Sequence, residues 1–522
     1  MGKGRIMRKI ILYMGVFSGI LACSPVFSAA SPYVKNQSVA IRSDVDRALE
    51  ADWKKKKLFP VQEASDALLV RRLYLDITGR LPSVENAKSF VYSRDPGKYE
   101  KLVDALLNSS DYVKYQGMHW GDILRIKSEF PINLWPNAVY IYMRRVERFL
   151  EKNEPYHEFV RQLLLAKGSN FRDAEANFYR AHADRSPLGI AKNIALTLCG
   201  IRLEKRSGKE QQAWARIFEE IGFKSTKEWK EEIVFIKACP AREIMLPNGK
   251  KVKVPANREA RRVLADFLTR SAEGKRILAE ALVNRTWYWF FGSGIIPAGD
   301  DRDGKAVNAP LLKILTDQVI ESNFDFRKLC RTIVCSAAYR SASFQGKDTV
   351  ARNLAFAAYP IRRLEAEVID DAITALSLQP SKYSSVIPEP FSFLPGDLRT
   401  VSIADGSISS SFLILFGRPS RDAGLMAERN NTINAKQRLF LYNSGALYRR
   451  VSQIMRRTEF NRLSFPGKVD MLYWMFYSRP PTFRERDIIE KRYNARPAKQ
   501  RWGMQSDLAW ILVNSAEFLH RH

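Results

Sequence analysis

The strongest constraint on the fold is an unbroken run of five aromatic residues in the second half of the chain. Leu282 to Pro297 reads LVNRTWYWFFGSGIIP, and the aromatic run ends at Gly292. Apolar residues upstream recur at helical spacing. We therefore predict a helix of about four turns that stops at Gly292, where a residue without Cβ can turn left-handed. Asn284, Trp287 and Phe291 share one stripe of this helix.

Two interpretations of this stripe are open. In the first, it belongs to a core helix in which Asn284 and Arg285 bind neighbouring backbone groups, because buried polar groups need partners. In the second, Arg285 and Trp287 line a binding pocket with aromatic platforms. We favour the core helix, because aromatic stripes at helical spacing usually lie in the interior.

The N-terminus has the pattern of a targeting segment. Four basic residues precede an apolar stretch from Ile10 to Ala22, which is shorter than the roughly 20 residues that span a bilayer. Ile20 to Cys23 resembles a lipoprotein box, with Cys23 as the candidate for lipidation, and Ser28-Ala29-Ala30 offers an ordinary cleavage site. We predict a signal peptide over residues 1–30 and export to the periplasm or cell envelope, or secretion, with a lipid anchor as the alternative. No later stretch is long and apolar enough to cross a membrane.

The chain is strongly basic. Its formal net charge is +28 over 522 residues, and +24 remains without residues 1–30, which hold four basic residues and no acidic one. Such a surplus indicates polyanionic partners: nucleic acid, anionic lipid headgroups, or acidic and sulfated glycans. Nucleic acid does not fit an exported protein. A generally basic surface without a specific ligand explains the charge equally well, because the basic residues are scattered along the sequence.

Cysteine and histidine usage points away from disulfide scaffolds and metal sites. After Cys23 there are four cysteines, with no C-x-x-C pair, and the chain has five histidines, none at metal-ligand spacing with a second ligand. We predict no metal and no cofactor, and one disulfide among the four cysteines stays open.

Several long motifs resemble a known family. R-R-L-Y-L-D-I-T-G-R-L-P begins at Arg71, H-W-x-D-I-L-R at His119, N-R-x-W-x-x-x-F-G-x-G-I-I at Asn284 and R-R-L-E-A-E at Arg362. Together they resemble the paired domains of unknown function found in exported proteins of planctomycetes and verrucomicrobia. The resemblance implies no established activity. It implies a sulfatase-like exported protein as a partner, because relatives are often encoded beside such proteins.

The chain departs from these relatives at their cysteine motifs. After Gly200-Ile201-Arg202-Leu203 the sequence reads EKRSGKEQ, where the family commonly carries a C-x-x-C-H-like motif. Further on, Leu425 and Ala427 stand in place of two family cysteines. Haem attachment needs both thiols and the axial imidazole, so we expect no haem and no metal there. Many relatives also carry a fused cytochrome domain, and the motifs of this sequence do not include one.

The expected fold is mostly α, with two helical domains joined by a short connector. The resemblance and the helical periodicity place the first domain at 41–203, the connector at 204–257 and the second domain at 258–519. The connector contains a predicted helix from Trp214 to Ile221 and a β-hairpin around Asn248-Gly249, because both central residues of such a turn need positive φ. We expect this hairpin to be the one clear β element. Ser83 and the Thr482-x-x-Glu485 capping box predict two helix starts.

Carboxylates supply the candidate catalytic residues. Asp76, Asp122 and Arg125 in the first domain fit either chemistry or a buried Asp–Arg pair that clamps two helices. In the second domain, Arg363, Glu367, Asp370 and Asp371 fall on one face of a predicted helix. Glu367 and Asp371 repel each other at i,i+4 unless a cation lies between them. A metal ion, a substrate ammonium group or Arg363 is the candidate cation.

Arginines supply the candidate binding residues. Arg418, Arg421 and Arg429 follow a long Ser- and Pro-rich segment from Pro380 to Ser411, and guanidinium groups match carboxylate and sulfate geometry. They form either an anion cradle or ties that hold loops to helix ends. Arg125, Arg285 and Trp287 complete the set of binding candidates.

Two functional classes follow. The first is a binding or accessory protein for polyanionic glycans or envelope surfaces. The second is a hydrolase or lyase that acts on acidic polysaccharide with Asp122, Glu367 or Asp371 as acid or base. The sequence shows no nucleophile elbow, no His-based triad and no metal cluster, so we rank the enzyme second.

Overall fold

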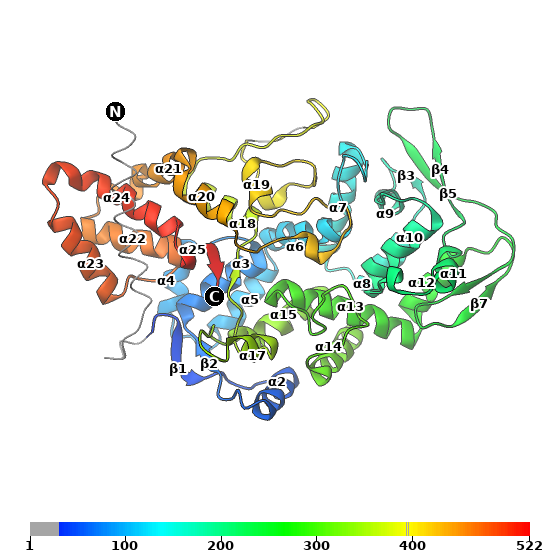
Figure 1. The fold of residues 1–522 in the computed structure, drawn as a ribbon, viewed down its shortest axis with the longest axis horizontal. Coiled ribbons are helices and arrows are strands. Elements are labelled where there is room, and N and C mark those ends of the chain that lie inside the picture. Colours follow the sequence, from blue (N-terminus) through cyan, green and yellow to red (C-terminus); the bar gives the residue numbers. More distant parts are fainter. Residues whose placement is uncertain (1–30, 393, 395) are drawn as a thin grey trace.

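The computed structural model describes residues 31–392, 394 and 396–522. The predicted signal peptide and the lipidation candidate Cys23 lie outside these residues. The described chain is mostly helical with small antiparallel sheets (Figure 1), which confirms the predicted fold class. None of the described helices combines the length and the apolar composition needed to cross a bilayer.

The first part of the chain is a succession of capped helices. Serines at 43, 65, 83 and 109 accept hydrogen bonds from backbone N–H groups of the helices that follow them, which confirms Ser83 as a helix start. A π-helical turn at Ala195–Cys199 extends the last helix. The elements are β1 (Val34–Ser38), α2 (Asp44–Lys55), β2 (Gln62–Ala64), α3 (Asp66–Thr78), α4 (Val84–Tyr92), α5 (Lys98–Leu107), α6 (Ser110–Ile123), α7 (Pro136–Lys152), α8 (Tyr156–Leu165), β3 (Gly168–Ser169), α9 (Asn177–Arg180) and α10 (Pro187–Ile194).

The connector contains more β-structure than the sequence predicts. Its elements are α11 (Gly208–Ala215), β4 (Ile221–Ser225), β5 (Glu232–Ile236), β6 (Arg242–Met245) and β7 (Lys251–Val254). The Asn-Gly hairpin is confirmed as β6–β7, with Ile244 opposite Val252. It is not the one clear β element, because β5 pairs with both β3 and β4 in a three-stranded sheet. Two further antiparallel pairs are β1–β2 and the pair of β8 (Arg362–Arg363) with β9 (His520–Arg521). The helix predicted from Trp214 to Ile221 is also wrong: the capping box of Ser207 and Glu210 starts α11 earlier, and Ile221 begins a strand.

The second part is again helical. Its elements are α12 (Ala260–Arg270), α13 (Ala272–Phe291), α14 (Ala309–Glu321), α15 (Phe326–Cys335), α16 (Ala337–Arg340), α17 (Thr349–Leu354), β8 (Arg362–Arg363), α18 (Ala366–Ser377), α19 (Ser411–Leu415), α20 (Ala435–Asn443), α21 (Gly445–Ser452), α22 (Phe465–Tyr477), α23 (Phe483–Asn494), α24 (Ala498–Val513), α25 (Ala516–Leu519) and β9 (His520–Arg521). The Thr482 capping box starts α23 as predicted.

Helix α13 is a core helix. It ends at Gly292, whose φ of 73° provides the predicted left-handed cap, and it begins earlier than the sequence pattern suggests. Asn284 binds the loop that follows: its Nδ2 donates to the Ile296 carbonyl at 3.0 Å, and its Oδ1 accepts from the Ile296 N–H at 2.8 Å. The ring of Trp287 is fully buried and stacks on Phe291 at 4.5 Å between centroids. The core interpretation of the aromatic stripe is confirmed.

The interior consists of two hydrophobic cores. The first contains side chains from before and after the connector, from Val39 to Tyr359, with Trp474. The second is built mainly from residues 364–519 and also takes Leu75, Tyr115 and Met118. Because α3 and α6 contribute to both cores, their buried charged residues lie between the cores.

Candidate functional site

The structure brings five of the predicted site residues into one buried cluster. Asp122 on α6 binds Arg421 (Nε to Oδ1, 2.8 Å) and Arg429 (Nη2 to Oδ2, 2.7 Å). Glu367 on α18 binds the same Arg429 (Nη1 to Oε2, 2.7 Å) and Arg418 (Nε to Oε1, 3.3 Å). Arg429 therefore bridges two carboxylates that come from the two halves of the chain.

The loop from Gly417 to Arg429 presents these arginines. A Cβ at Gly417 would lie 1.9 Å from the Asn430 carbonyl, and Gly417 has a φ of 80°, so the tight turn needs glycine. Glu428 closes the loop, because its carboxylate accepts hydrogen bonds from the backbone N–H groups of Asp422, Ala423 and Gly424, with N···O distances of 2.9 to 3.1 Å. The three arginines are thus held on a rigid turn against α6.

Arg421 and Arg418 also fix the long segment that precedes this loop. Arg421 donates to the carbonyls of Ile126 at 3.2 Å and Ala404 at 2.7 Å, and Arg418 donates to those of Asp405 and Ile408. Gly121 makes room for this arrangement, because a Cβ there would lie 3.1 Å from Nη1 of Arg421. The geometry fits the prediction that these arginines hold loops to helix ends.

Electrostatics keep this cluster ionised. Burial would raise the pKa of Asp122, but Arg429 and Arg421 outweigh it and lower that pKa. Burial likewise opposes ionisation of Glu367, and Arg429 and Arg418 lower its pKa. Burial alone would lower the pKa of Arg429, and the two carboxylates raise it well above its usual value. Carboxylates held ionised by arginines on both sides are suited to clamping elements together and poorly suited to giving up or taking a proton.

A second buried network lies beside the first, and of its members the sequence analysis named only Asp76 as a candidate. Arg521, two residues from the last helix, pairs with Asp76 on α3 and with Glu365 (Nη1 to Oε2, 2.6 Å). It also donates to the hydroxyl of Tyr115 at 2.7 Å. The hydroxyls of Tyr339 and Tyr359 donate to Asp76 at 2.8 and 2.6 Å. No local pattern indicates these contacts, because each joins segments that are far apart in the sequence.

His119 lies between the two networks. Its ring stacks on Trp289 at 5.2 Å between centroids and meets Tyr115 edge-on at 4.8 Å. Burial and the nearby Arg429 lower its pKa to about 4. The imidazole is therefore neutral at pH 7, and it packs as a core aromatic group.

Asp371 has a separate environment, and Arg363 is not the cation between it and Glu367. The Thr400 N–H donates to Asp371 Oδ1 at 2.5 Å, and Arg399 Nε lies 3.4 Å from Oδ2. Arg363 lies in β8, before α18 begins, and its guanidinium donates to the carbonyls of Phe416 and Asn430. The prediction that Arg363 shares the helix face is wrong, because the helix starts after Glu365.

Burial raises the pKa of Asp371 to about 6, although Arg399 and the Thr400 N–H oppose the shift. A raised pKa means that the folded protein keeps a proton that the unfolded chain loses near pH 4, so stability is lost as the pH rises through 6. Between pH 7 and pH 5 we expect wild type to gain about 1 kcal/mol relative to Asp371→Asn. Urea unfolding of both proteins at the two pH values measures this difference. If the two proteins differ in free energy of unfolding by the same amount at both pH values, the Asp371 carboxyl is exposed to water.

The remaining binding candidates are buried elsewhere. Arg125 donates to the Ala423 carbonyl and to Thr197 Oγ1, each at 3.1 Å, and burial lowers its pKa to about 10. Arg285 donates to the Leu196 carbonyl at 3.3 Å. Both arginines thus hold the π-helical turn that follows α10. Asp122 pairs with the distant Arg421 and Arg429, whereas the nearby Arg125 has a φ of 57° and follows the end of α6.

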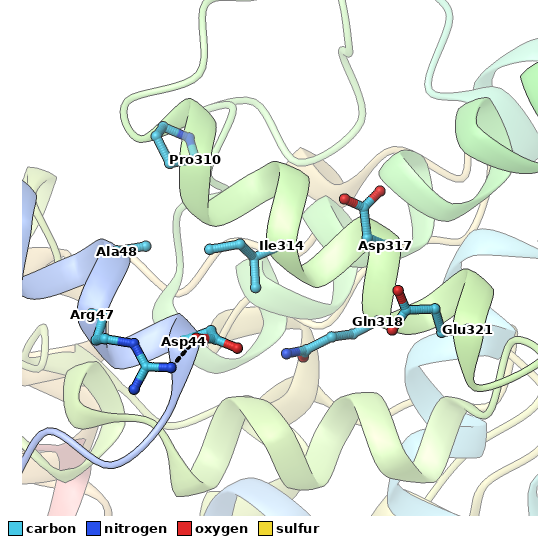
Figure 2. A pocket seen from close by; sticks show the side chains of 8 residues that line it. All are labelled: Asp44, Arg47, Ala48, Pro310, Ile314, Asp317, Gln318 and Glu321. Atoms are coloured by element: carbon cyan, nitrogen blue, oxygen red, sulfur yellow. Dashed lines mark hydrogen bonds and ion pairs between the residues drawn. The ribbon is translucent and has the colours of Figure 1, made fainter.

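A pocket of about 500 Å³ lies between α2 and α14 (Figure 2). Its charged side chains are Asp44, Arg47, Asp317 and Glu321, and the predicted site residues do not line it. Arg47 is paired with Asp44, as the dashed line shows. The acidic lining does not suit a polyanion. Across the described residues, no group of three or more histidine, cysteine, aspartate or glutamate side chains is placed to hold a metal ion.

Fold and site define a mostly helical protein in which buried arginine–carboxylate networks join two hydrophobic cores. Two family models match it: PSCyt2, a protein of unknown function (DUF1549), over residues 44–197, and PSD1, a protein of unknown function (DUF1553), over residues 260–493. The chain therefore carries both of these planctomycete-type domains, and no cytochrome domain is detected in it. Comparisons with curated proteins and with solved structures give no match.

Proposed function

We propose that this protein is an exported binding or accessory protein for polyanionic glycans or the anionic envelope surface, and that it works beside a sulfatase-like exported partner. The basic and then apolar N-terminal sequence supports export, and the net charge of +24 that remains without residues 1–30 supports an anionic ligand. The buried arginines are bound to carboxylates and carbonyls, so the surface is the part of the protein that a large polyanion reaches.

One surface feature carries the proposal. Arg144, Arg148 and Lys152 follow each other at i, i+4 and i+8 along α7, and all three are exposed. In the described part of the chain they form no ion pair, while Glu151 is exposed beside them. A helix rises about 1.5 Å per residue, so these charges span roughly 12 Å. A row of exposed cations at a regular helical spacing suits the regularly spaced anionic groups of a polysaccharide.

The test is retention of the protein, starting at Ser31, on sulfated and desulfated mucin glycans across a salt series. We expect retention on the sulfated glycan that falls at least ~10-fold between about 0.05 and 0.5 M salt, because screening shortens the reach of exposed charges. We expect Arg144→Glu with Arg148→Glu to weaken retention further, since each reversal adds repulsion to a lost attraction.

A matched control separates a specific stripe from total charge. Lys55→Glu with Lys57→Glu changes the net charge by the same amount at another exposed site. Equal losses in the two double variants would show that the stripe has no special role. Retention that does not change with salt concentration would overturn the polyanion proposal.

The hydrolase or lyase remains the second candidate, and Asp371 is the observation that favours it. A carboxyl with a pKa of about 6 is partly protonated near neutral pH, which suits a general acid. Its burial and the hydrogen bonds that it accepts from the Thr400 and Val401 N–H groups place it away from solvent. Released sugar product in the retention samples, lost in Asp371→Asn, would make this protein an enzyme.

A further inference from the structure

Three aromatic side chains from distant segments meet at one end of α7. Trp135, which precedes the helix, meets Trp229 edge-on at 5.9 Å between ring centroids and Phe391 at 5.4 Å. Trp229 lies in the turn between β4 and β5, and Phe391 lies in the long segment before α19. In Figure 1 this hairpin and the start of α7 are on the same side of the molecule. We call Trp135, Trp229 and Phe391 the aromatic platform.

The aromatic platform is open to solvent. Trp229 is 67% exposed and Phe391 is 44% exposed, and Trp135 is partly buried beneath them. Large aromatic rings are rarely left in water together unless they contact something else. The arrangement therefore indicates a ligand that covers ring faces.

The hairpin that carries Trp229 is rich in lysine. The Nζ of Lys230 lies 5.0 Å from the centre of the Trp135 ring and 5.4 Å from that of Trp229. Lys224 and Lys227 are exposed on the same hairpin, and Glu228 is the exposed acid beside them. The ligand that covers the rings must therefore tolerate or carry negative charge.

The backbone that presents the rings is strained. Trp135 has a φ of 74° and Asn133 one of 60°, while Lys227 and Lys230 in the hairpin turn have 70° and 60°. Residues other than glycine avoid these values, and such strain gathers at functional sites where the fold holds it for a purpose. Here the strained residues include one ring of the platform and the lysine that lies over it.

We propose that the aromatic platform binds a sugar ring of an anionic polysaccharide. The C–H face of a pyranose packs on the exposed indole of Trp229, and the acidic substituent of the sugar pairs with Lys230 and its neighbours. This inference rests on the proposed function and gives it a specific site, because the platform adjoins the helix that carries Arg144, Arg148 and Lys152. The platform selects the sugar, and the helix attracts the charge of the following residues of the polymer.

The test compares Trp229→Ala with wild type on the sulfated mucin glycan and on its desulfated form. Trp229 is exposed, so its removal leaves the core intact. We expect a ~10-fold loss of affinity on both glycans, at a salt concentration where wild type still binds, because stacking on an aromatic face depends little on ionic strength. Phe483→Ala is the control: Phe483 is 87% exposed on α23, far from the platform.

Each outcome separates this inference from the proposed function. If Trp229→Ala binds like wild type while Arg144→Glu with Arg148→Glu does not bind, the polyanion proposal stands and the platform is wrong. If wild type binds the desulfated glycan and Trp229→Ala does not, the platform proposal is supported and the polyanion proposal is not. If wild type binds neither glycan, both are overturned. If Trp229→Ala loses binding to phosphatidylglycerol vesicles and keeps its affinity for glycan, the sugar assignment is wrong and a membrane surface is the ligand.

Discussion

Replacement of Arg429 by methionine is expected to lower the free energy of unfolding by about 3–5 kcal/mol. Arg429 makes four hydrogen bonds of 2.7 to 3.1 Å, two to Asp122 and two to Glu367. Methionine keeps much of the length of the side chain but removes the shared cation. Both carboxylates stay buried, each with only one arginine. Such a loss is a large part of the stability of a typical domain, so we also expect a lower yield of folded protein.

Two further variants show whether the charge or the packing causes this loss. Adding Glu367→Gln to Arg429→Met removes one of the stranded charges, so the double variant should be less destabilised than the two single effects predict together. Arg457→Met breaks a partly exposed pair with Glu459 and two hydrogen bonds to the carbonyls of Ala375 and Leu376, and should cost about 1–2 kcal/mol. Urea unfolding of wild type, the double variant and the three single variants Arg429→Met, Glu367→Gln and Arg457→Met measures the series. Equal losses of stability in Arg429→Met and Arg457→Met would mean that Arg429 does not bridge Asp122 and Glu367 in solution.

Features set by neighbouring residues were predictable from the sequence. Gly292 ends α13, the Asn248-Gly249 turn makes the β6–β7 hairpin, and Ser83 and Thr482 begin helices. In each case the residue type satisfies or permits a backbone geometry within a few positions of itself. The short strands were not predictable in the same way. β8 pairs with β9 near the C-terminus, and neither two-residue segment has a period to recognise.

The sequence supplied the members of the ionic cluster but not their partners. Asp122, Glu367, Arg418, Arg421 and Arg429 were all identifiable as unusual charges within helices or after a long loop. Arg421 and Arg429 reach Asp122 from 299 and 307 positions away, a distance over which no spacing rule applies. Arg125 is only three positions away, but it lies beyond the end of α6 and turns toward Thr197.

The basic row on α7 and the aromatic platform also differ in whether the sequence alone reveals them. The i, i+4, i+8 spacing of Arg144, Arg148 and Lys152 is visible in the sequence and would have identified the basic stripe. The aromatic platform has no such signal, because its three rings come from three loops that only the folded chain brings together. Local patterns thus reveal a face of one element, and sites assembled from several loops require the structure.

Acidification from pH 7 to pH 5 is expected to lower the free energy of unfolding, and His119 alone accounts for about 2 kcal/mol of the loss. Burial and Arg429 hold the pKa of His119 at about 4, and burial and Arg125 hold that of His182 well below its usual value. A lowered pKa means that the unfolded chain takes up protons near pH 6.5 while the folded protein does not. The stability that these neutral rings contribute is therefore present above pH 6.5 and is lost as the pH falls toward 4. His182 and the buried His522 add to this loss in the same direction, and Asp371 offsets about 1 kcal/mol of it. His119→Phe preserves the stack on Trp289 and should remove about 2 kcal/mol of the pH dependence, which urea unfolding at both pH values measures. If the free energy of unfolding of His119→Phe changes between pH 7 and pH 5 as much as that of wild type, His119 takes up its proton in the folded protein as readily as in the unfolded chain. The space between the two ionic networks would then be open to water.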